Sequence, residues 1–171
     1  MEMAVVIEAI KHRSASLKLV EFSSFILSRS KSGTLPDYCN INLMEIPHLV
    51  PHVFVFDVLN SSDKLMLKYC GTKIDGFYGV NMTGKCIIDY YKGEEGFDEV
   101  EAIFWQGIHT KKPAYTCRTI HLENDYVNKY MVAETVMFPC SSDAKTINYT
   151  LGFADYYYVQ SDKEHCVTLI E

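Results

Sequence analysis

The sequence has no long hydrophobic run. Nowhere in its 171 residues do about 18 apolar residues follow one another, the minimum for a membrane-spanning helix. The first residues, MEMAVVIEAIKHR, also lack the basic start and long apolar stretch of a secretory signal. We therefore expect a cytoplasmic protein with no membrane partner.

An excess of positive charge is also missing. The formal net charge is −6 and the pI is about 5.5. Nucleic-acid binding depends on clustered Lys and Arg that neutralise phosphates. We therefore expect no nucleic-acid partner.

Closely spaced metal ligands are absent as well. The six cysteines are scattered singly, with no C-x-x-C motif, which argues against a structural zinc site. In a reducing compartment such cysteines mostly serve as small buried side chains. His48 and His52 flank a proline-rich segment, but two histidines alone make a weak metal site, and we expect no metal.

No motif for catalysis or nucleotide binding is complete. The chain has no G-x-S-x-G elbow, and nothing in the sequence brings Asp57 and Glu134 together as an acid–base pair. The stretch GVNMTGKC, residues 79–86, comes close to a phosphate-binding P-loop, but Cys86 stands where the loop needs Ser or Thr. No buried strand runs directly into that stretch. We therefore expect neither an enzyme nor a P-loop.

The residues that are present predict a folded domain with two main helices. Hydrophobic residues make up 48% of the chain and charged residues 22%, which is typical of a globular protein. Helical spacing predicts a helix over residues 4–31, with 13–16 as the place where it can break, and another over 94–112.

Strand patterns fill much of the remainder. Residues 52–59 and 64–71 read as a β-hairpin, and three more strands are predicted over 114–122, 127–138 and 146–156. Short one-turn helices are expected over 72–93, and the last residues, 157–171, show no clear period. The hairpins indicate an antiparallel sheet.

Three segments carry a resemblance to a known family. LPDYCNINLMEIPHLVPHVFVFDV, LKYCGTKIDGFYGVNMTGK and AETVMFPCSSD resemble, in this order, motifs of a bacterial PAS family that is common in alphaproteobacteria. Thr135 departs from the pattern, because a basic residue is common at its place. The resemblance covers about residues 20–156.

The resemblance implies an α+β fold. A PAS domain has a five-stranded antiparallel sheet with short helices and one connector helix on one face; here an N-terminal helix is added. It divides the chain into an N-terminal helical extension (1–34), a PAS-like domain (35–156) and a C-terminal tail (157–171). It also implies that Gly84 serves a turn through its backbone freedom, with Lys85 in solvent.

PAS domains sense small molecules or pair with other chains, and no output module is evident in this sequence. We therefore expect a sensory, signal-transducing domain that binds a small molecule, a partner signalling protein, or both. The candidate lining residues are Phe54, Phe56, Leu67, Tyr69, Ile74, Phe77, Phe104, Tyr130, Val132, Glu134 and Tyr149. The same residues also fit a filled core. If Glu134 faces inward it needs a partner, either Arg118 on the neighbouring strand or a ligand.

The cofactor remains unidentified, and the sequence argues against haem and flavin. His109, the candidate haem ligand, follows Ile108 on the apolar face and should point about 100° away from it. Light-sensing PAS relatives carry a reactive cysteine in an Asn-Cys-Arg-Phe context, whereas Cys86 lies in Gly-Lys-Cys-Ile-Ile.

A ligand-free interaction module is the alternative. A homodimer through residues 5–27 would place Phe22, Phe25 and Ile26 at its seam. A mainly apolar exposed face on this helix would favour that alternative, and a serine-rich one would weaken it.

Overall fold

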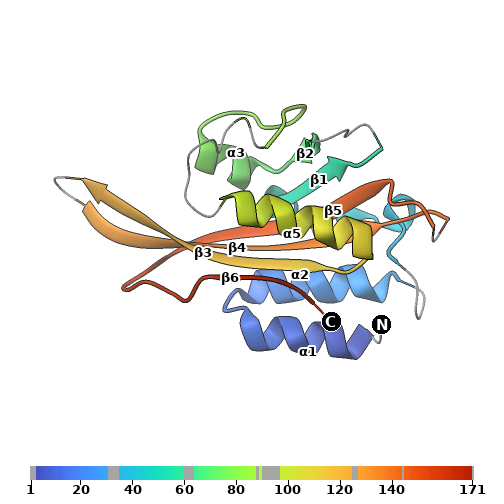
Figure 1. Cartoon of the computed structure of the whole chain (residues 1–171), viewed down its shortest axis with the longest axis horizontal. Coiled ribbons are helices and arrows are strands. Elements are labelled where there is room, and N and C mark those ends of the chain that lie inside the picture. Colours follow the sequence, from blue (N-terminus) through green and yellow to red (C-terminus); the bar gives the residue numbers. More distant parts are fainter. Residues whose placement is uncertain are drawn as a thin grey trace.

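The computed structural model describes residues 3–30, 35–59, 64–87, 89, 97–124, 127–143 and 145–170. One antiparallel sheet has the strand order β2-β1-β5-β4-β3-β6, with helices on both faces (Figure 1). The helices are α1 (Met3–Arg13), α2 (Leu17–Ser28), α3 (Thr72–Tyr78) and α5 (Phe97–Thr110), with short 3-10 helices at Tyr38–Asn40, Leu43–Glu45 and Val50–His52. The strands are β1 (Val53–Asp57), β2 (Leu67–Cys70), β3 (Ala114–Asn124), β4 (Val127–Cys140), β5 (Tyr149–Val159) and β6 (Cys166–Leu169). Among the described helices, none has the length and apolar character to cross a membrane.

The expected α+β fold class is confirmed. The predicted hairpin, connector helix and three long strands are all present. The long N-terminal helix is interrupted at residues 14–16, where Ser16 caps α2 by accepting a hydrogen bond from the Leu19 N–H. The structure also adds a sixth strand, β6, in the segment for which the sequence showed no period. Its four residues become a strand by pairing with β3.

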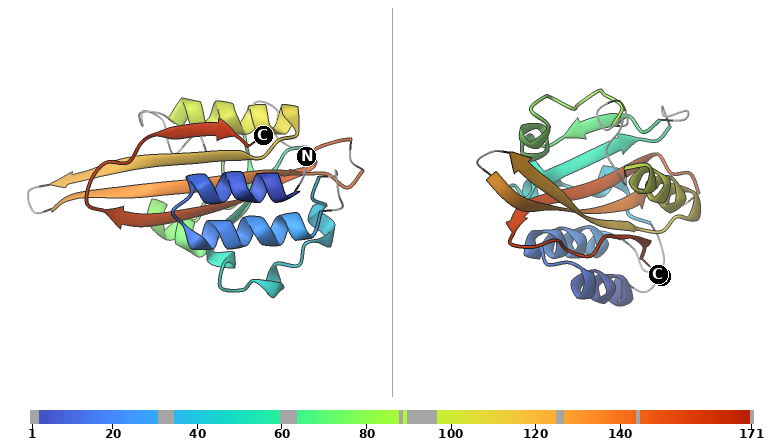
Figure 2. Two further views of the ribbon diagram at one scale, coloured as in Figure 1. Left: turned by 90° about the horizontal axis from the view of Figure 1, so that it is seen from below. Right: turned by 60° about the vertical axis from the view of Figure 1, so that its left-hand side comes forward.

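The N-terminal helices cover one face of the sheet, which we call the outer face (Figure 2). We name α1, residues 14–16 and α2 together the helical cap. Phe22 is fully buried, with its ring centroid 5.1 Å from that of Phe153 on β5. Ile26 is also fully buried, and Phe25 packs partly buried against the same core. The residues proposed for a dimer seam are thus used inside the chain.

The opposite, inner face packs against α3 and α5. Its core contains Phe54, Phe56 and Phe104, whose ring centroids lie 5.2–6.3 Å apart. The Phe54 ring lies directly on Gly152 of β5, where an added Cβ would come within 2.1 Å of Phe54 Cζ. A glycine at this position therefore lets the aromatic core approach the sheet.

Residues 79–86 form a turn and not a phosphate loop. Gly84 has a φ of +80°, a conformation that glycine adopts without strain. Its N–H donates to the Leu67 carbonyl at 2.7 Å, so it does not point at a ligand. The reading of Gly84 as a turn residue is confirmed.

We predict that Phe22→Ala lowers the free energy of unfolding by about 3–5 kcal/mol, because it leaves a cavity between the helical cap and the sheet. Urea unfolding followed by circular dichroism measures this. Leu17→Ala is the matched control, since Leu17 is 85% exposed. Equal stabilities of the two variants would show that the cap is not packed as described.

Candidate functional site

A small cavity lies between the inner face of the sheet and helices α3 and α5. Its volume is about 50 Å³, enough for a few water molecules when each needs about 10–15 Å³. Pockets for drug-sized ligands are usually about 300–1,000 Å³. The lining residues are Phe54, Leu67, Cys70, Ile74, Tyr78, Met82, Ile87, Phe97, Val100, Phe104, Thr116, Arg118, Ala133, Thr135, Ala154 and Tyr156.

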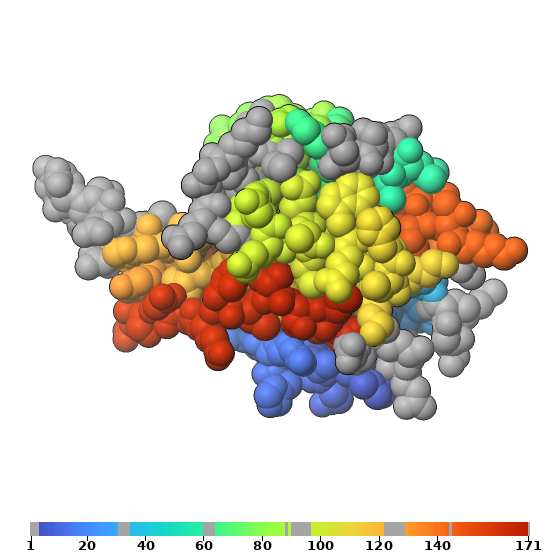
Figure 3. Space-filling view, in the orientation of Figure 1, coloured from blue at the N-terminus to red at the C-terminus, as the bar shows by residue number. Residues whose placement is uncertain are grey.

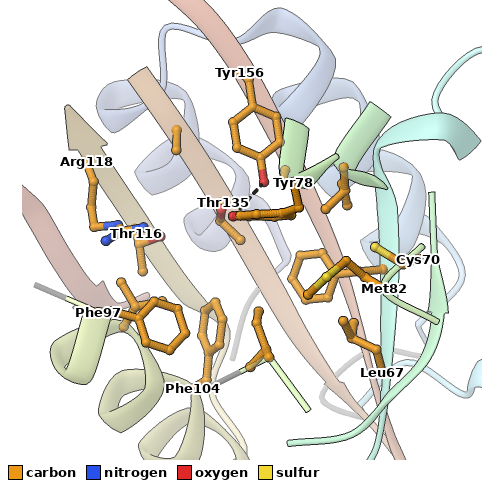
Figure 4. A pocket seen from close by; sticks show the side chains of 16 residues that line it. Leu67, Cys70, Tyr78, Met82, Phe97, Phe104, Thr116, Arg118, Thr135 and Tyr156 are labelled. Atoms are coloured by element: carbon orange, nitrogen blue, oxygen red, sulfur yellow. Dashed lines mark hydrogen bonds between the residues drawn. The ribbon is translucent and has the colours of Figure 1, made fainter. Parts of the chain in front are cut away.

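The polar groups of the cavity gather on the β3–β4 side (Figure 4). Thr116 and Thr135 are register partners on neighbouring strands, so their hydroxyls lie side by side. Arg118 follows two residues along β3 and points to the same face. The rest of the wall is apolar or aromatic, which gives the cavity one polar edge.

Arg118 is the charged group of this edge. It is half-buried, and its guanidinium carbon lies 5.8 Å from the centroid of the Phe97 ring. Among the described residues, no carboxylate forms an ion pair with it. A guanidinium presents several N–H donors in a plane and suits an anionic or carbonyl-bearing group.

Two tyrosines stand beside the polar edge. The hydroxyls of Tyr78 on α3 and Tyr156 on β5 lie 3.5 Å apart, as Figure 4 shows. Phe77 stacks on the Tyr156 ring with a centroid distance of 4.2 Å. The aromatic contacts thereby hold α3 against the sheet at this end.

The structure divides the lining residues expected from sequence into three groups. Phe54, Leu67, Ile74 and Phe104 line the cavity. Phe56 and Phe77 pack immediately behind it. The others lie outside the cavity: Tyr69, Val132, Glu134 and Tyr149 lie on the outer-face side, and Tyr130 stacks on His121 farther along β4.

The reason for these placements is strand register. A strand turns successive side chains to opposite faces, so Val132 and Glu134 face away from Ala133 and Thr135. In β2 the register shifts at Lys68, since Val55 pairs with Tyr69 and Phe56 with Leu67. This bulge puts Leu67 and Tyr69 on different faces.

Sequence reasoning missed the polar lining residues. Thr116, Arg118 and Thr135 are not apolar, so a search for a hydrophobic lining passes over them. The available signal was the presence of Thr116 and Arg118 two residues apart along β3, which places both polar side chains on one face of the strand.

On the outer face, Glu134 is the residue that binds the helical cap. Its carboxylate accepts four hydrogen bonds: from the Ser14 hydroxyl, from the N–H groups of Ala15 (3.1 Å) and Ser16 (3.3 Å), and from the Tyr157 hydroxyl. Glu134 is only 1% exposed. The expectation of an ion pair with Arg118 is wrong, because Cys117 pairs with Glu134 in the register and Arg118 points to the other face.

Tyr157 extends this network. Its hydroxyl also accepts a hydrogen bond of 2.9 Å from Lys163 Nζ. Burial and the neighbouring Glu134 raise the pKa of Tyr157. Tyr157 therefore stays protonated and continues to donate to Glu134.

Asp155 lies next to Glu134 on β5 and binds the same turn of the cap. It accepts a hydrogen bond of 2.7 Å from the Ser16 hydroxyl. His52 Nδ1 donates to the Ala154 carbonyl at 3.1 Å and lies 3.4 Å from Asp155 Oδ1. Two carboxylates on neighbouring strands thus hold the start of α2.

Cavity and cap contacts alternate along the same two strand segments. In β4, Ala133 and Thr135 line the cavity while Glu134 binds the cap. In β5, residues 154 and 156 line the cavity while 155 binds the cap. The two kinds of contact are therefore one residue apart along each strand.

The remaining candidate cofactor ligands lie apart from the cavity. His109 is exposed and stacks on Trp105, and His48 lies on Glu21. Cys86 is half-buried with its sulfur 2.8 Å from Met66 Sδ. Within the described part of the chain, no group of three or more His, Cys, Asp or Glu side chains could hold a metal ion.

Comparisons with known proteins find similar solved structures. No family model matches this chain, and no curated protein resembles it closely in sequence. The light-oxygen-voltage (LOV) domain of a blue-light activated histidine kinase from Erythrobacter litoralis is 14% identical, with 63% of this chain and 96% of that chain covered and a TM-score of 0.45. A LOV domain studied with a flavin analogue is 10% identical (71% and 86% covered, TM-score 0.48). An RNA-binding LOV receptor is 12% identical (89% and 47% covered, TM-score 0.46). The antiparallel sheet and the connector helix of this chain agree with the expected PAS-like fold; the alphaproteobacterial family stays a prediction.

The expectation against flavin is contradicted by these comparisons, since the three solved structures named above are LOV domains and one of them was studied with a flavin analogue. The chemical character of the cavity lining suits a flavin ring system. The lining combines aromatic and aliphatic walls with hydroxyl and guanidinium groups along one edge. At about 50 Å³, however, lining side chains must move before a ring system can enter. The expectation about haem stays a prediction.

We predict that Glu134→Gln loosens the helical cap. An amide retains one acceptor oxygen but replaces the other by a donor, so buried donors of residues 14–16 or Tyr157 lose their partner, at a cost of about 1–3 kcal/mol. Hydrogen–deuterium exchange should show faster exchange in residues 14–19. Glu21→Gln, on the exposed side of α2, is the control. Unchanged exchange in Glu134→Gln would contradict this role.

We also predict that stability falls as the pH is lowered through about 6.5 and below. Burial lowers the pKa of His52 from its usual 6.5. The unfolded chain therefore binds more protons than the folded one in this range, which favours unfolding. Thermal or urea unfolding between pH 7.5 and 5.5 would measure the slope. His52→Asn should flatten the dependence of stability on pH, whereas His48→Asn, at an exposed site, should leave this dependence unchanged. If His52→Asn and the natural sequence show the same slope, the pH dependence does not come from His52.

Proposed function

We propose that this chain is a sensory PAS-fold domain that binds a small molecule in the inner-face cavity and transmits its state to the helical cap. It has no catalytic role in this proposal. The observation that carries it is the alternation along β4 and β5, where Thr135 and Tyr156 line the cavity and Glu134 and Asp155 hold the cap. One strand segment therefore couples the two faces.

The chemistry of the cavity defines the class of ligand. Apolar and aromatic walls favour a flat, largely apolar molecule. Arg118, Thr116 and Thr135 favour an anionic or carbonyl-bearing edge on that molecule. Flavins belong to this class, and flavin mononucleotide is therefore the first probe to use.

The cap is the surface through which a signal would leave. It is held by hydrogen bonds at residues 14–16 and by apolar contacts along α2. When the cap moves, the apolar outer face of the sheet becomes available to a partner signalling protein or to a second copy of the chain. Partner identity, location in the cell and the absence of nucleic-acid binding stay predictions.

A ligand-free interaction module is the second candidate. The exposed side of the cap carries Leu17 at 85% and Val5 at 50% exposure, which favours an interaction surface. Ser28, Glu21 and Lys18 share the exposed side of α2, and this polar character weakens the case. We therefore place the ligand-binding function first.

We predict that the purified protein binds flavin mononucleotide or retains a small molecule of the same class. Absorbance near 370 and 450 nm would report a flavin, and native mass spectrometry would report any other bound mass. Arg118→Met should weaken flavin mononucleotide binding about tenfold or more, because a hydrogen bond to a charged group is lost. Lys145→Met, which removes an exposed cation, should leave binding unchanged.

Binding should also change hydrogen–deuterium exchange in residues 14–19 of the cap. Binding without that change would refute the coupling but not the ligand site. A protein that purifies without a small molecule and does not bind flavin mononucleotide would refute the ligand site, and a clean dimer in the same sample would favour the interaction module.

A further inference from the structure

Two cysteines lie directly opposite each other on the last two strands of the sheet. Cys117 on β3 and Cys166 on β6 are register partners. Partners in an antiparallel pair project to the same face, and here this is the outer face. Cys117 is 6% exposed within the outer core, and Cys166 is half-buried against it.

The Cα spacing of the pair suits a disulfide, and a small shift of β6 would bring the Cβ atoms from the roughly 4.5–5.5 Å of a cross-strand pair to the roughly 3.5–4.5 Å of a disulfide. The Ile170 N–H donates to the Pro113 carbonyl at 2.8 Å, which makes 113 and 170 a hydrogen-bonded pair. Because this pattern repeats every two residues, 117 and 166 belong to the same class, with a Cα separation of about 5.5 Å. Disulfides usually span roughly 4.4–6.8 Å between Cα atoms.

The edge position of β6 allows the small movement that bond formation needs. β6 is the last strand of the sheet and has only β3 as a neighbour. Figure 3 shows it in dark red on the molecular surface, between α5 and the helical cap. An edge strand of four residues can shift without breaking a second ladder, and its position gives an oxidant access to Cys166.

We propose that Cys117 and Cys166 form a thiol pair that is oxidised reversibly to a cross-strand disulfide. The oxidant is a low-molecular-weight disulfide such as oxidised glutathione. This inference is independent of the cavity and of its ligand.

The reaction balances without any other oxidant. Cys166, as thiolate, attacks one sulfur of oxidised glutathione, which releases one glutathione and leaves a mixed disulfide. Cys117 then loses its proton and attacks the Cys166 sulfur, which releases the second glutathione. Two protein thiols become one disulfide, and the two protons end on the two glutathione thiols.

The surroundings explain the order of the two steps. Burial and the Glu134 carboxylate raise the pKa of the Cys117 thiol to about 11, which makes it a poor first nucleophile. Cys166 is the more accessible of the two. Cys117 therefore acts second, when the mixed disulfide on Cys166 is held opposite it.

The test uses the full chain. After exposure to oxidised glutathione, the chain is unfolded in urea with N-ethylmaleimide present, so that buried and exposed free thiols are both blocked, and peptides are mapped without reduction. We expect a peptide that joins residues 117 and 166, its reversal by dithiothreitol, and slower amide exchange in β6. Cys86→Ser, which removes another half-buried thiol, should leave the link intact. Cys166→Ser should abolish it and leave Cys117 blocked by the maleimide.

The proposal is overturned if, in the natural sequence, Cys117 is recovered as a maleimide-blocked thiol after the treatment. In that case Cys166 would be found either blocked as well or as a persistent mixed disulfide with glutathione. It is also overturned if Cys117 joins a different cysteine. These results come from the natural sequence, so they stand even if a serine variant fails to fold.

Discussion

The structure depends on the buried carboxylate of Glu134. A carboxylate on the outer face of the sheet has to be hydrogen-bonded if it is to be buried at low cost. Residues 14–16 supply three of its four hydrogen bonds, and they can do so because the N-terminal helix is interrupted there. The interruption, the direction of α2 and the burial of its apolar face against the sheet all follow from satisfying this group.

The sheet makes contacts with both the cavity and the cap because side chains alternate along a strand. Residues 133–135 and 154–156 each contact the cavity with some side chains and the cap with others. Only backbone separates the two sets of contacts. In the proposed function, a displacement on one side would therefore reach the other side without any long pathway.

The outer face also carries a continuous row of reactive and charged groups. Cys166, Cys117, Glu134 and Asp155 are successive register partners across β6, β3, β4 and β5. The cap covers the carboxylate end of this row, and β6 forms its other end at the edge of the sheet. The site of proposed oxidation and the attachment site of the cap are therefore neighbours, although their residues are far apart in sequence.

The sequence by itself determined the elements and the fold class, because helical and strand periodicity and turn residues are local properties. It also indicated the break near residue 14 and a role for Gly84. It could not determine which face each strand residue occupies: the bulge at Lys68 and the pairing of β4 with β3 and β5 decided that Tyr69, Val132 and Glu134 lie on the outer face and not toward the cavity. Strand β6 and the pairing of Cys117 with Cys166 likewise exist only through contacts between distant segments, which a local pattern does not encode.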